Sequence, residues 1–183
     1  MDAAGAACGA RLGAAGSGEE GQIHPWRNGL VELPDGYWAV PYQARSSRHT
    51  VPQEHQPALF PKLQPNQNRW ARWRPHRLCG VEAETEGRFT IPTVYRREGE
   101  LRLNYRCAPG GWIRVELLRY IPTMQCVDAN PLQGYSLADC DLLAGDEEDQ
   151  VVTWKGEGDI SGVGEMAAIR VEMFQAKLFA YRL

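Results

Sequence analysis

Apolar and mostly charged residues alternate one by one in several segments after residue 100, and this pattern most constrains the fold. It is clearest at residues 101–106, 112–117 and 168–173. Strict alternation places the two kinds of side chain on opposite faces of a strand, as in a strand with one buried face. A further apolar run follows at 178–183. These segments predict a β-sheet with one buried and one exposed face.

Turn-forming residues separate many short segments of this kind after residue 78. Glu98 and Gly99 predict a turn before 101–106, and Pro-Gly-Gly at 109–111 predicts another before 112–118. More strands are expected at 87–91 and 151–154, with an acidic loop at 145–149 and another loop at 156–164. Short strands with turn signals roughly every 8–12 residues are typical of a β-sandwich. The sequence therefore predicts an all-β fold with a β-sandwich domain over 79–183.

The preceding part of the chain has fewer strand signals. Residues 29–33 and 37–42 predict a β-hairpin around Pro-Asp-Gly at 34–36, with Pro41 expected to end the return strand or place it at an edge. A long irregular connection is expected over 44–68, followed by a strand at 68–74. About three strands cannot easily bury their own apolar face, so 23–78 is expected to need a neighbour. Residues 1–22, rich in alanine and glycine, are predicted to be disordered.

The charge balance bears on nucleic-acid binding, and the cysteines bear on metal sites and disulfides. The chain has 20 basic and 23 acidic residues, and the arginines at 69–77 are interleaved with tryptophans, so we interpret them as lying over tryptophan faces rather than as a nucleic-acid surface. No cofactor and no metal cluster is expected, because the five cysteines are widely spaced. Cys79 and Cys107 are expected as small buried hydrophobes, and a disulfide between Cys126 and Cys140 is an open possibility. No signal peptide or membrane-spanning run is visible, so membrane partners are not expected and a cytoplasmic location is the default.

Several motifs resemble a known family. They include Gly-Tyr-Ser-Leu-Ala-Asp-Cys-Asp at 134–141, Val-Thr-Trp-Lys-Gly at 152–156, Ile-Arg-Val-Glu-Met at 169–173 and the closing Leu-Phe-Ala-Tyr-Arg-Leu. This part is similar to the C-terminal β-sandwich of bacterial glycosidase-like proteins built on a five-bladed β-propeller, as in the fructosidase or invertase-type glycoside hydrolases. Residues 29–36 and 38–42 resemble a late propeller blade of the same proteins. The resemblance covers about residues 26–183 and implies a partial propeller blade over 23–78 before the sandwich.

The resemblance implies a carbohydrate-processing parent protein. In that family the two catalytic carboxyl groups lie on early and middle blades, which this sequence lacks, so no catalytic residue is assigned and the chain is expected not to be a complete enzyme. The sandwich is then a structural or accessory module. Two alternatives stay open: a free-standing carbohydrate-binding or protein-interaction domain, and a gene fragment with exposed apolar surface on 23–78. The oligomeric state is not predicted.

A few residues are candidates for contact with a ligand. In the resembled propellers, strand ends and loops face a central pocket, which points to Tyr42, Arg45 and His49. Trp112 is a candidate platform for a sugar ring if the aliphatic residues beside it form the core, because alternation then turns it outward. If the strand is covered on both sides, Trp112 is packed instead, and the sequence leaves this choice open. Trp154 is expected to be a core anchor instead. The acidic runs 139–141 and 146–149 are expected to be solvated loops that cap turns, with calcium as the lesser option.

Overall fold

The computed structural model describes residues 5–7, 22–25, 27, 29–45 and 67–183. These residues form strands and no helix, which confirms the predicted all-β class. It follows that none of the described residues belongs to a helix long and apolar enough to cross a membrane. The chain divides into two compact units, one made of Met1–Cys8 with Cys79–Leu183 and the other of Gly9–Leu78. Each unit is described by itself.

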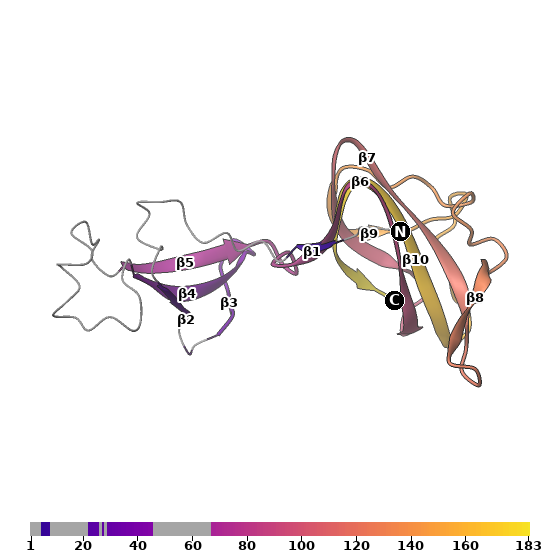
Figure 1. Cartoon of the computed structure of the whole chain (residues 1–183), viewed down its shortest axis with the longest axis horizontal. Helices are drawn as coiled ribbons and strands as arrows, with labels where there is room; N and C mark the ends of the chain where they lie inside the picture. The colour runs from indigo at the N-terminus through magenta and orange to yellow at the C-terminus, as the bar shows by residue number, and fades with distance from the viewer. Residues whose placement is uncertain (1–4, 8–21, 26, 28, 46–66) are drawn as a thin grey trace. The chain divides into compact units, whose positions relative to one another are not determined.

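The larger unit is built on a six-stranded antiparallel sheet (Figure 1). Its order is β1-β6-β10-β7-β8, and β9 also pairs with β7. The strands are β1 (Gly5–Ala7), β6 (Gly80–Tyr95), β7 (Arg102–Ile121), β8 (Cys126–Pro131), β9 (Asp146–Val151) and β10 (Met166–Arg182). The predicted strand segments at 101–106 and 112–117 thus belong to one strand, and those at 168–173 and 178–183 belong to another. β10 is the central strand, between β6 and β7.

The three long strands curve over near their middles, as Figure 1 shows. In β10, the pairing with both neighbours shifts between Phe174 and Ala176, and the intervening Gln175 has a φ of 46°. Residues 84–85 of β6 and 108–111 of β7 lie opposite this one residue, so the extra residues form β-bulges in β6 and β7, and bulges bend the strands that carry them. Pro-Gly-Gly at 109–111 lies inside the bend of β7, so the predicted turn is wrong: the strand continues through it. A Cβ on Gly111 would lie 2.8 Å from the carbonyl oxygen of Phe174, so the bend depends on glycine there.

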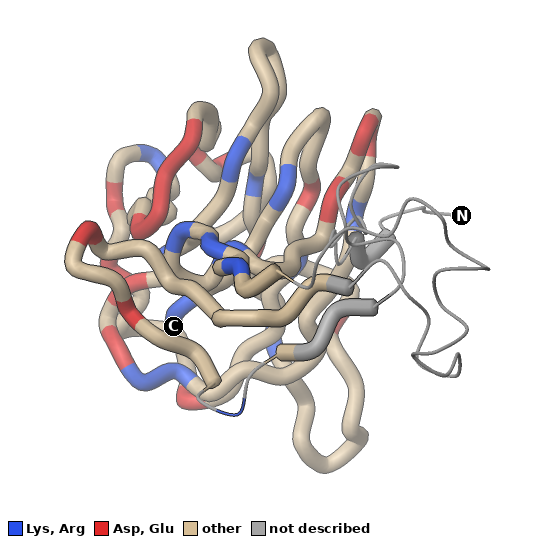
Figure 2. Tube along the Cα trace, turned by 90° about the vertical axis from the view of Figure 1, so that its left-hand side faces the viewer, with Lys and Arg blue, Asp and Glu red and all other residues tan. Residues whose placement is uncertain are grey.

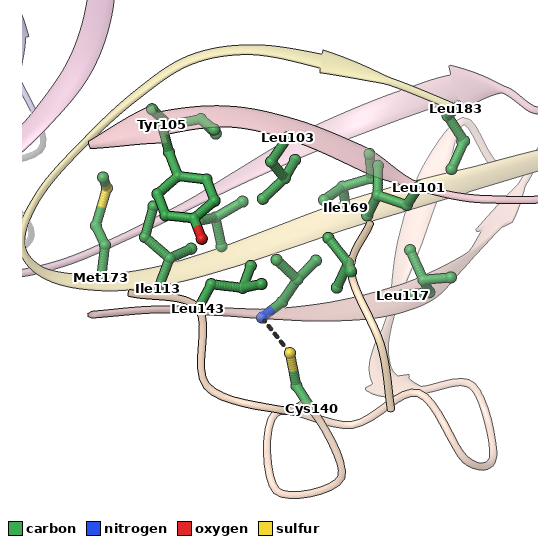
Figure 3. Close-up of a cluster of buried hydrophobic side chains, with 14 of the residues drawn as sticks. Leu101, Leu103, Tyr105, Ile113, Leu117, Cys140, Leu143, Ile169, Met173 and Leu183 are labelled. Atoms are coloured by element: carbon green, nitrogen blue, oxygen red, sulfur yellow. Dashed lines mark hydrogen bonds between the residues drawn. The ribbon is translucent and has the colours of Figure 1, made fainter. Parts of the chain in front are cut away.

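The core lies on the inner face of this bent sheet (Figure 3). Leu103 and Tyr105 from the first part of β7 belong to the same buried cluster as Ile113 and Val115 from its second part. The connection between β8 and β10 covers the rest of the inner face, with these buried residues: Cys140, Leu143, Val152, Trp154, Ile160 and Val163. The opposite face, which carries the alternate residues of each strand, is called the outer face below. This division follows the alternation in the sequence.

Two predictions about this unit are corrected by strand pairing. The acidic residues 146–149 belong to β9 rather than to a loop, because Arg102 in the neighbouring strand binds Asp149 through Nη1–Oδ2 at 3.1 Å. Gly5–Ala7, within the segment predicted to be disordered, pairs with β6 from Gly80 to Glu82. The other residues of 1–21 lie outside the described part of the chain. Cross-strand ion pairs of this kind offset the low β-propensity of acidic residues.

The smaller sheet has four antiparallel strands around β4. They are β2 (Gln22–Pro25), β3 (Val31–Glu32), β4 (Trp38–Arg45) and β5 (Gln67–Trp73). The predicted hairpin is confirmed, since the amide of Leu33 donates to the carbonyl of Tyr37 at 2.7 Å. The strand does not end at Pro41, which pairs with Trp70 of β5. On its other side, Pro41 falls between the residues that pair with β2 and those that pair with β3, so among the described residues its missing N–H breaks no ladder there.

The described cysteines differ from expectation at Cys79, and they decide the disulfide that the sequence left open. Cys79 is exposed and disulfide-bonded rather than buried as a hydrophobe. Cys126 and Cys140 are free. Cys126 pairs with Ile121, whereas the Cys140 thiol accepts a hydrogen bond from the amide of Val115 at 3.3 Å (Figure 3). Six strand residues separate these two points on β7, about 20 Å, which is too far for a disulfide.

Candidate binding surface

The outer face of the larger sheet carries side chains in regular rows across β6, β10 and β7. Register places Phe174 opposite Trp112 on one side and Glu86 on the other. The next row holds Arg88, Glu172 and Arg114, and the row after that holds Thr90, Arg170 and Glu116. Basic and acidic positions accordingly lie opposite each other in these two rows. Figure 2 shows blue and red segments on neighbouring parts of the backbone.

Trp112 and Phe174 form the aromatic row of this face. Their ring centroids are 6.4 Å apart and the rings are inclined by 24°, a stacked arrangement. Ile113 and Val115, which follow Trp112 in β7 and which alternation places on the opposite face, are fully buried. The aliphatic face is therefore the core, and Trp112 points to the outer face, where it is half-buried. A stacked pair on neighbouring strands holds a flat apolar surface in a fixed orientation.

Arg114 lies beside the aromatic row. Its guanidinium carbon is 5.9 Å from the centroid of the Trp112 ring, within the range of a cation–π contact. Its Nε is buried and has no hydrogen-bond partner within the described part of the chain. Opposite Arg114, Glu172 is ion-paired with Arg88. The row next to the aromatic rings thus combines a cation with a carboxylate.

Glu116 and Arg170 close the far end of this face. Their Oε1 and Nη1 atoms are 2.5 Å apart, and the side chains are only 7% and 23% exposed. The amide of Leu137 also donates to Glu116 Oε2, and Arg170 Nε donates to the hydroxyl of Thr90. Because both charges are mutually satisfied and largely covered, this pair fixes β7 against β10 rather than offering groups to a ligand.

A hollow of about 520 Å³ opens where the three long strands bend. Its lining comes from β6, β7 and β10: Glu82, Ala83, Glu84, Arg106, Cys107, Ala108, Pro109, Gln175, Ala176 and Lys177. Lys177 Nζ is 3.0 Å from Glu82 Oε2. The volume lies in the usual range for small-molecule sites. The hollow therefore combines room for a ligand with both signs of charge.

The thiols near the core are held protonated. Burial raises the pKa of Cys107 to about 11 and that of Cys140 to about 11. Burial also raises the pKa of Tyr105 to about 12, and its hydroxyl donates to the carbonyl of Ala144 at 3.1 Å. A thiol with such a raised pKa is a poor nucleophile at neutral pH. These groups serve packing.

The aspartates of the connection between β8 and β10 hold turns. Asp141 Oδ2 accepts hydrogen bonds from Thr153 Oγ1 at 2.5 Å and from the amide of Gly156 at 2.7 Å. Asp139 accepts from Ser136 and binds Lys155 Nζ at 2.5 Å. These hydrogen bonds lower the pKa of both carboxyls, with Thr153 the largest cause for Asp141 and Lys155 for Asp139. The turn-capping interpretation of residues 139–141 is confirmed, and in the described ranges no His, Cys, Asp or Glu cluster could hold a metal ion.

The candidate residues from the sequence are not brought together by the described structure. Tyr42 lies within β4 and is half-buried, opposite Arg69 of β5. Arg45 ends β4, opposite Gln22. His49 lies outside the described residues. Trp112 belongs to the other unit.

The two remaining aromatic predictions have clear outcomes. Trp154 is a core anchor as expected, because it is 3% exposed and its Nε1 donates to the carbonyl of Val115 at 3.0 Å. In the basic stretch, Arg72 lies over the ring of Tyr37 at 4.1 Å rather than over a tryptophan, and it binds Asp35 at 2.8 Å. Tyr37 and Asp35 are neighbours of Arg72 through the β3–β4 turn and the β4–β5 pairing. Arginine over an aromatic ring is thus seen at this position.

Sequence reasoning missed Phe174 and the hollow. The sequence contains part of the pattern behind each of them. In β10, the alternation that runs from Arg170 through Glu172 places Phe174 on the same face. Likewise, Glu82, Glu84 and Glu86 alternate along β6. These patterns could not predict the aromatic row or the hollow, because only the pairing of the strands shows which of them lie side by side.

Comparison with protein-family models, curated proteins and solved structures finds no match to this chain. The resemblance to glycosidase-like proteins therefore stays a prediction from the motifs.

Proposed function

We propose that this chain is a non-catalytic β module of a carbohydrate-processing protein and that the outer face of its larger sheet contacts the glycan. The observation that carries the proposal is the stacked, half-buried pair of Trp112 and Phe174 on that face, with Arg114 beside it. The motif resemblance to the sandwich of propeller glycoside hydrolases supports the same class of ligand. In this proposal the larger unit is that sandwich and the smaller sheet is the partial blade.

The chemistry of the outer face suits a sugar. A sugar ring has an apolar face of C–H groups and an edge of hydroxyls that both donate and accept hydrogen bonds. A rigid aromatic pair offers apolar area with little loss of conformational entropy. Arg114, Glu172 and Arg88 next to it offer donors and acceptors for the hydroxyls. Small-molecule sites usually combine aromatic rings with a small number of precisely placed polar groups.

Catalysis is assigned to the parent protein and not to this chain. Glycoside hydrolysis uses two carboxyl groups that face each other across the sugar. By resemblance, those groups lie on blades that this sequence lacks. We therefore expect the purified chain to show no turnover of fructosides, arabinosides or sialosides. Release of reducing sugar above the buffer rate would contradict the non-catalytic part of the proposal.

Binding is tested separately with a glycan array and the Trp112→Ala variant. Removing the ring should weaken glycan binding about tenfold or more, as expected for a central aromatic contact. Tyr95→Ala is the matched control, because Tyr95 is 65% exposed at the end of β6 and lies away from the aromatic row. Unchanged circular dichroism must accompany both variants. Binding that survives Trp112→Ala would exclude this face.

A second candidate function, contact with another protein, is favoured by the smaller sheet. Trp70 of β5 is 57% exposed and Leu30 is 50% exposed, whereas the buried apolar residues among those described for this sheet are the small ones Ala39, Pro41 and Ala44. A sheet with so little core and exposed large apolar groups fits a surface that needs a neighbour. Concentration-dependent association measured by sedimentation, and lost in Trp70→Thr, would support this role. A monomer at all concentrations would count against self-association through this sheet.

A further inference from the structure

The hollow adjoins the aromatic row along all three long strands. Gln175, which lines the hollow, directly follows Phe174 in β10. Glu84 of the hollow and Glu86 of the aromatic row are alternate residues of β6, and same-face neighbours along a strand are about 7 Å apart. Pro109 of the hollow precedes Trp112 through the bend of β7. The two features are therefore adjacent parts of one surface.

The charges around the hollow balance. Register aligns Glu82, Lys177, Arg106 and Asp146 across four strands, in the order acid, base, base, acid. Lys177 is bound to Glu82 at 3.0 Å. Asp146 lies beside the hollow and not in its lining, so the lining holds two acids, Glu82 and Glu84, and two bases, Lys177 and Arg106, with the amide of Gln175 as a further polar group. The site thus presents both donors and acceptors but no excess of positive charge.

Such a lining distinguishes neutral from acidic ligands. A neutral hydroxyl-rich ring can donate to carboxylates and accept from cationic groups at the same time. A carboxylate ligand would lose hydration and meet Glu84 without a surplus of cations to offset that loss. A hollow of about 520 Å³ is large enough for one or two sugar rings.

We infer that the hollow is a selectivity subsite that takes a neutral sugar residue of the glycan whose neighbouring residue stacks on Trp112, and that it rejects acidic sugars. This inference rests on the proposed function and adds to it the class of sugar. Glu84 is the residue that excludes an acidic group, and Arg106 donates to the ligand hydroxyls. Ala83 and Ala176 are small and buried beneath them, and they leave the depth of the hollow open.

The test is titration calorimetry of the full chain with three probes: a neutral fructo-oligosaccharide, a neutral arabino-oligosaccharide and sialyllactose. At least one neutral probe should bind with an affinity about tenfold higher than that of sialyllactose, or more. Arg106→Ala should weaken the neutral probe about tenfold, as expected for loss of hydrogen bonds to a charged donor. Glu84→Lys should raise the affinity for sialyllactose, a gain that unfolding cannot imitate. Glu157→Lys, an equal charge change at an exposed position outside the hollow, should alter neither affinity.

The outcomes separate this inference from the proposed function. If a neutral probe binds and Trp112→Ala abolishes binding, but Arg106→Ala and Glu84→Lys have no effect, the subsite is wrong and the glycan-binding face stands. Sialyllactose bound as tightly as the neutral probes would also overturn the subsite alone. No binding of any probe by the folded chain would overturn both proposals.

Discussion

Gly111 is the residue at which the bend of β7 is most sensitive to a single added carbon. A Cβ there would meet the backbone oxygens of Gln175 and Phe174, the latter at 2.8 Å, and backbone cannot move aside as a side chain can. We expect Gly111→Ala to lower the free energy of unfolding by about 1–3 kcal/mol through overpacking. Urea denaturation followed by tryptophan fluorescence measures this loss.

Gly162→Ala is the control for that prediction. No atom lies within 4 Å of a Cβ at Gly162, and its φ is not in the left-handed region. Gly162→Ala should therefore change the urea concentration at the midpoint of unfolding very little. If the two variants unfolded at the same urea concentration, the close approach at the bend would not limit stability.

Loss of the largely buried Glu116–Arg170 ion pair should lower the free energy of unfolding more than loss of an exposed ion pair. The side chains of the buried pair are 7% and 23% exposed, so Glu116→Ala leaves a largely covered guanidinium without its partner. We expect a loss of about 3–5 kcal/mol in the free energy of unfolding. Glu98→Ala removes the exposed partner of Arg182, at 3.4 Å and 45% exposed, and should cost at most about 1 kcal/mol. Equal losses in the two variants would contradict the role given to burial.

At the residue scale, the sequence was sufficient where alternation alone decides the environment. It places Ile113 and Val115 on the face opposite Trp112, and the burial of those two residues in the structure then decides that the ring faces outward. It does not predict that Phe174 stacks on Trp112, because their adjacency depends on long-range register. The propeller-based candidates Tyr42 and Arg45 stay predictions.

The connection between β8 and β10 is an element held together by aspartates, and its stability should depend on pH. Hydrogen bonds from Thr153 and Gly156 lower the pKa of Asp141. A carboxyl with a lowered folded pKa stabilises the fold above its unfolded pKa of about 3.9, and this stabilisation is lost as pH falls through the folded value. We expect Asp141→Asn to lower the melting temperature at pH 7, and the difference from the natural chain to shrink below about pH 4.

The measurement is a series of melting curves at decreasing pH. Glu157→Gln, in the same connection, has no side-chain hydrogen bond to the turn among the described residues and should show no difference at either pH. If the difference in melting temperature between Asp141→Asn and the natural chain stayed constant or grew in acid, the stabilising role of the Asp141 carboxylate would be contradicted.

Elements were predicted well in type and poorly in continuity. Pro-Gly-Gly at 109–111 is a turn signal in isolation, yet β7 continues through it as a bulge, because its pairing with β10 resumes on both sides, at Cys107 and at Trp112. The acidic residues of β9 were expected in a loop because local propensity disfavours them in strands. Pairing with Arg102 outweighs that preference. Both errors arise from interactions between strands that a local pattern does not contain.

At the scale of the whole molecule, the two units should differ in stability. The larger one has an extended core around Leu103, Ile113 and Ile169, whereas the apolar residues described as buried in the smaller one are two alanines and Pro41. Little buried apolar area means a low free energy of opening. We expect backbone amides of β4 to exchange with solvent much faster than those of β7 and β10. Hydrogen exchange followed by mass spectrometry measures this, and equal protection in both sheets would contradict it.

The central position of β10 has a consequence for synthesis. The ribosome makes β6 and β7 well before β10, and neither can complete its ladder until the strand that separates them has emerged. During that interval the nascent polypeptide exposes two long unpaired edges, a state that invites wrong partners. Chaperone demand during translation should therefore be concentrated in the time between the appearance of these early strands and the arrival of the one that joins them.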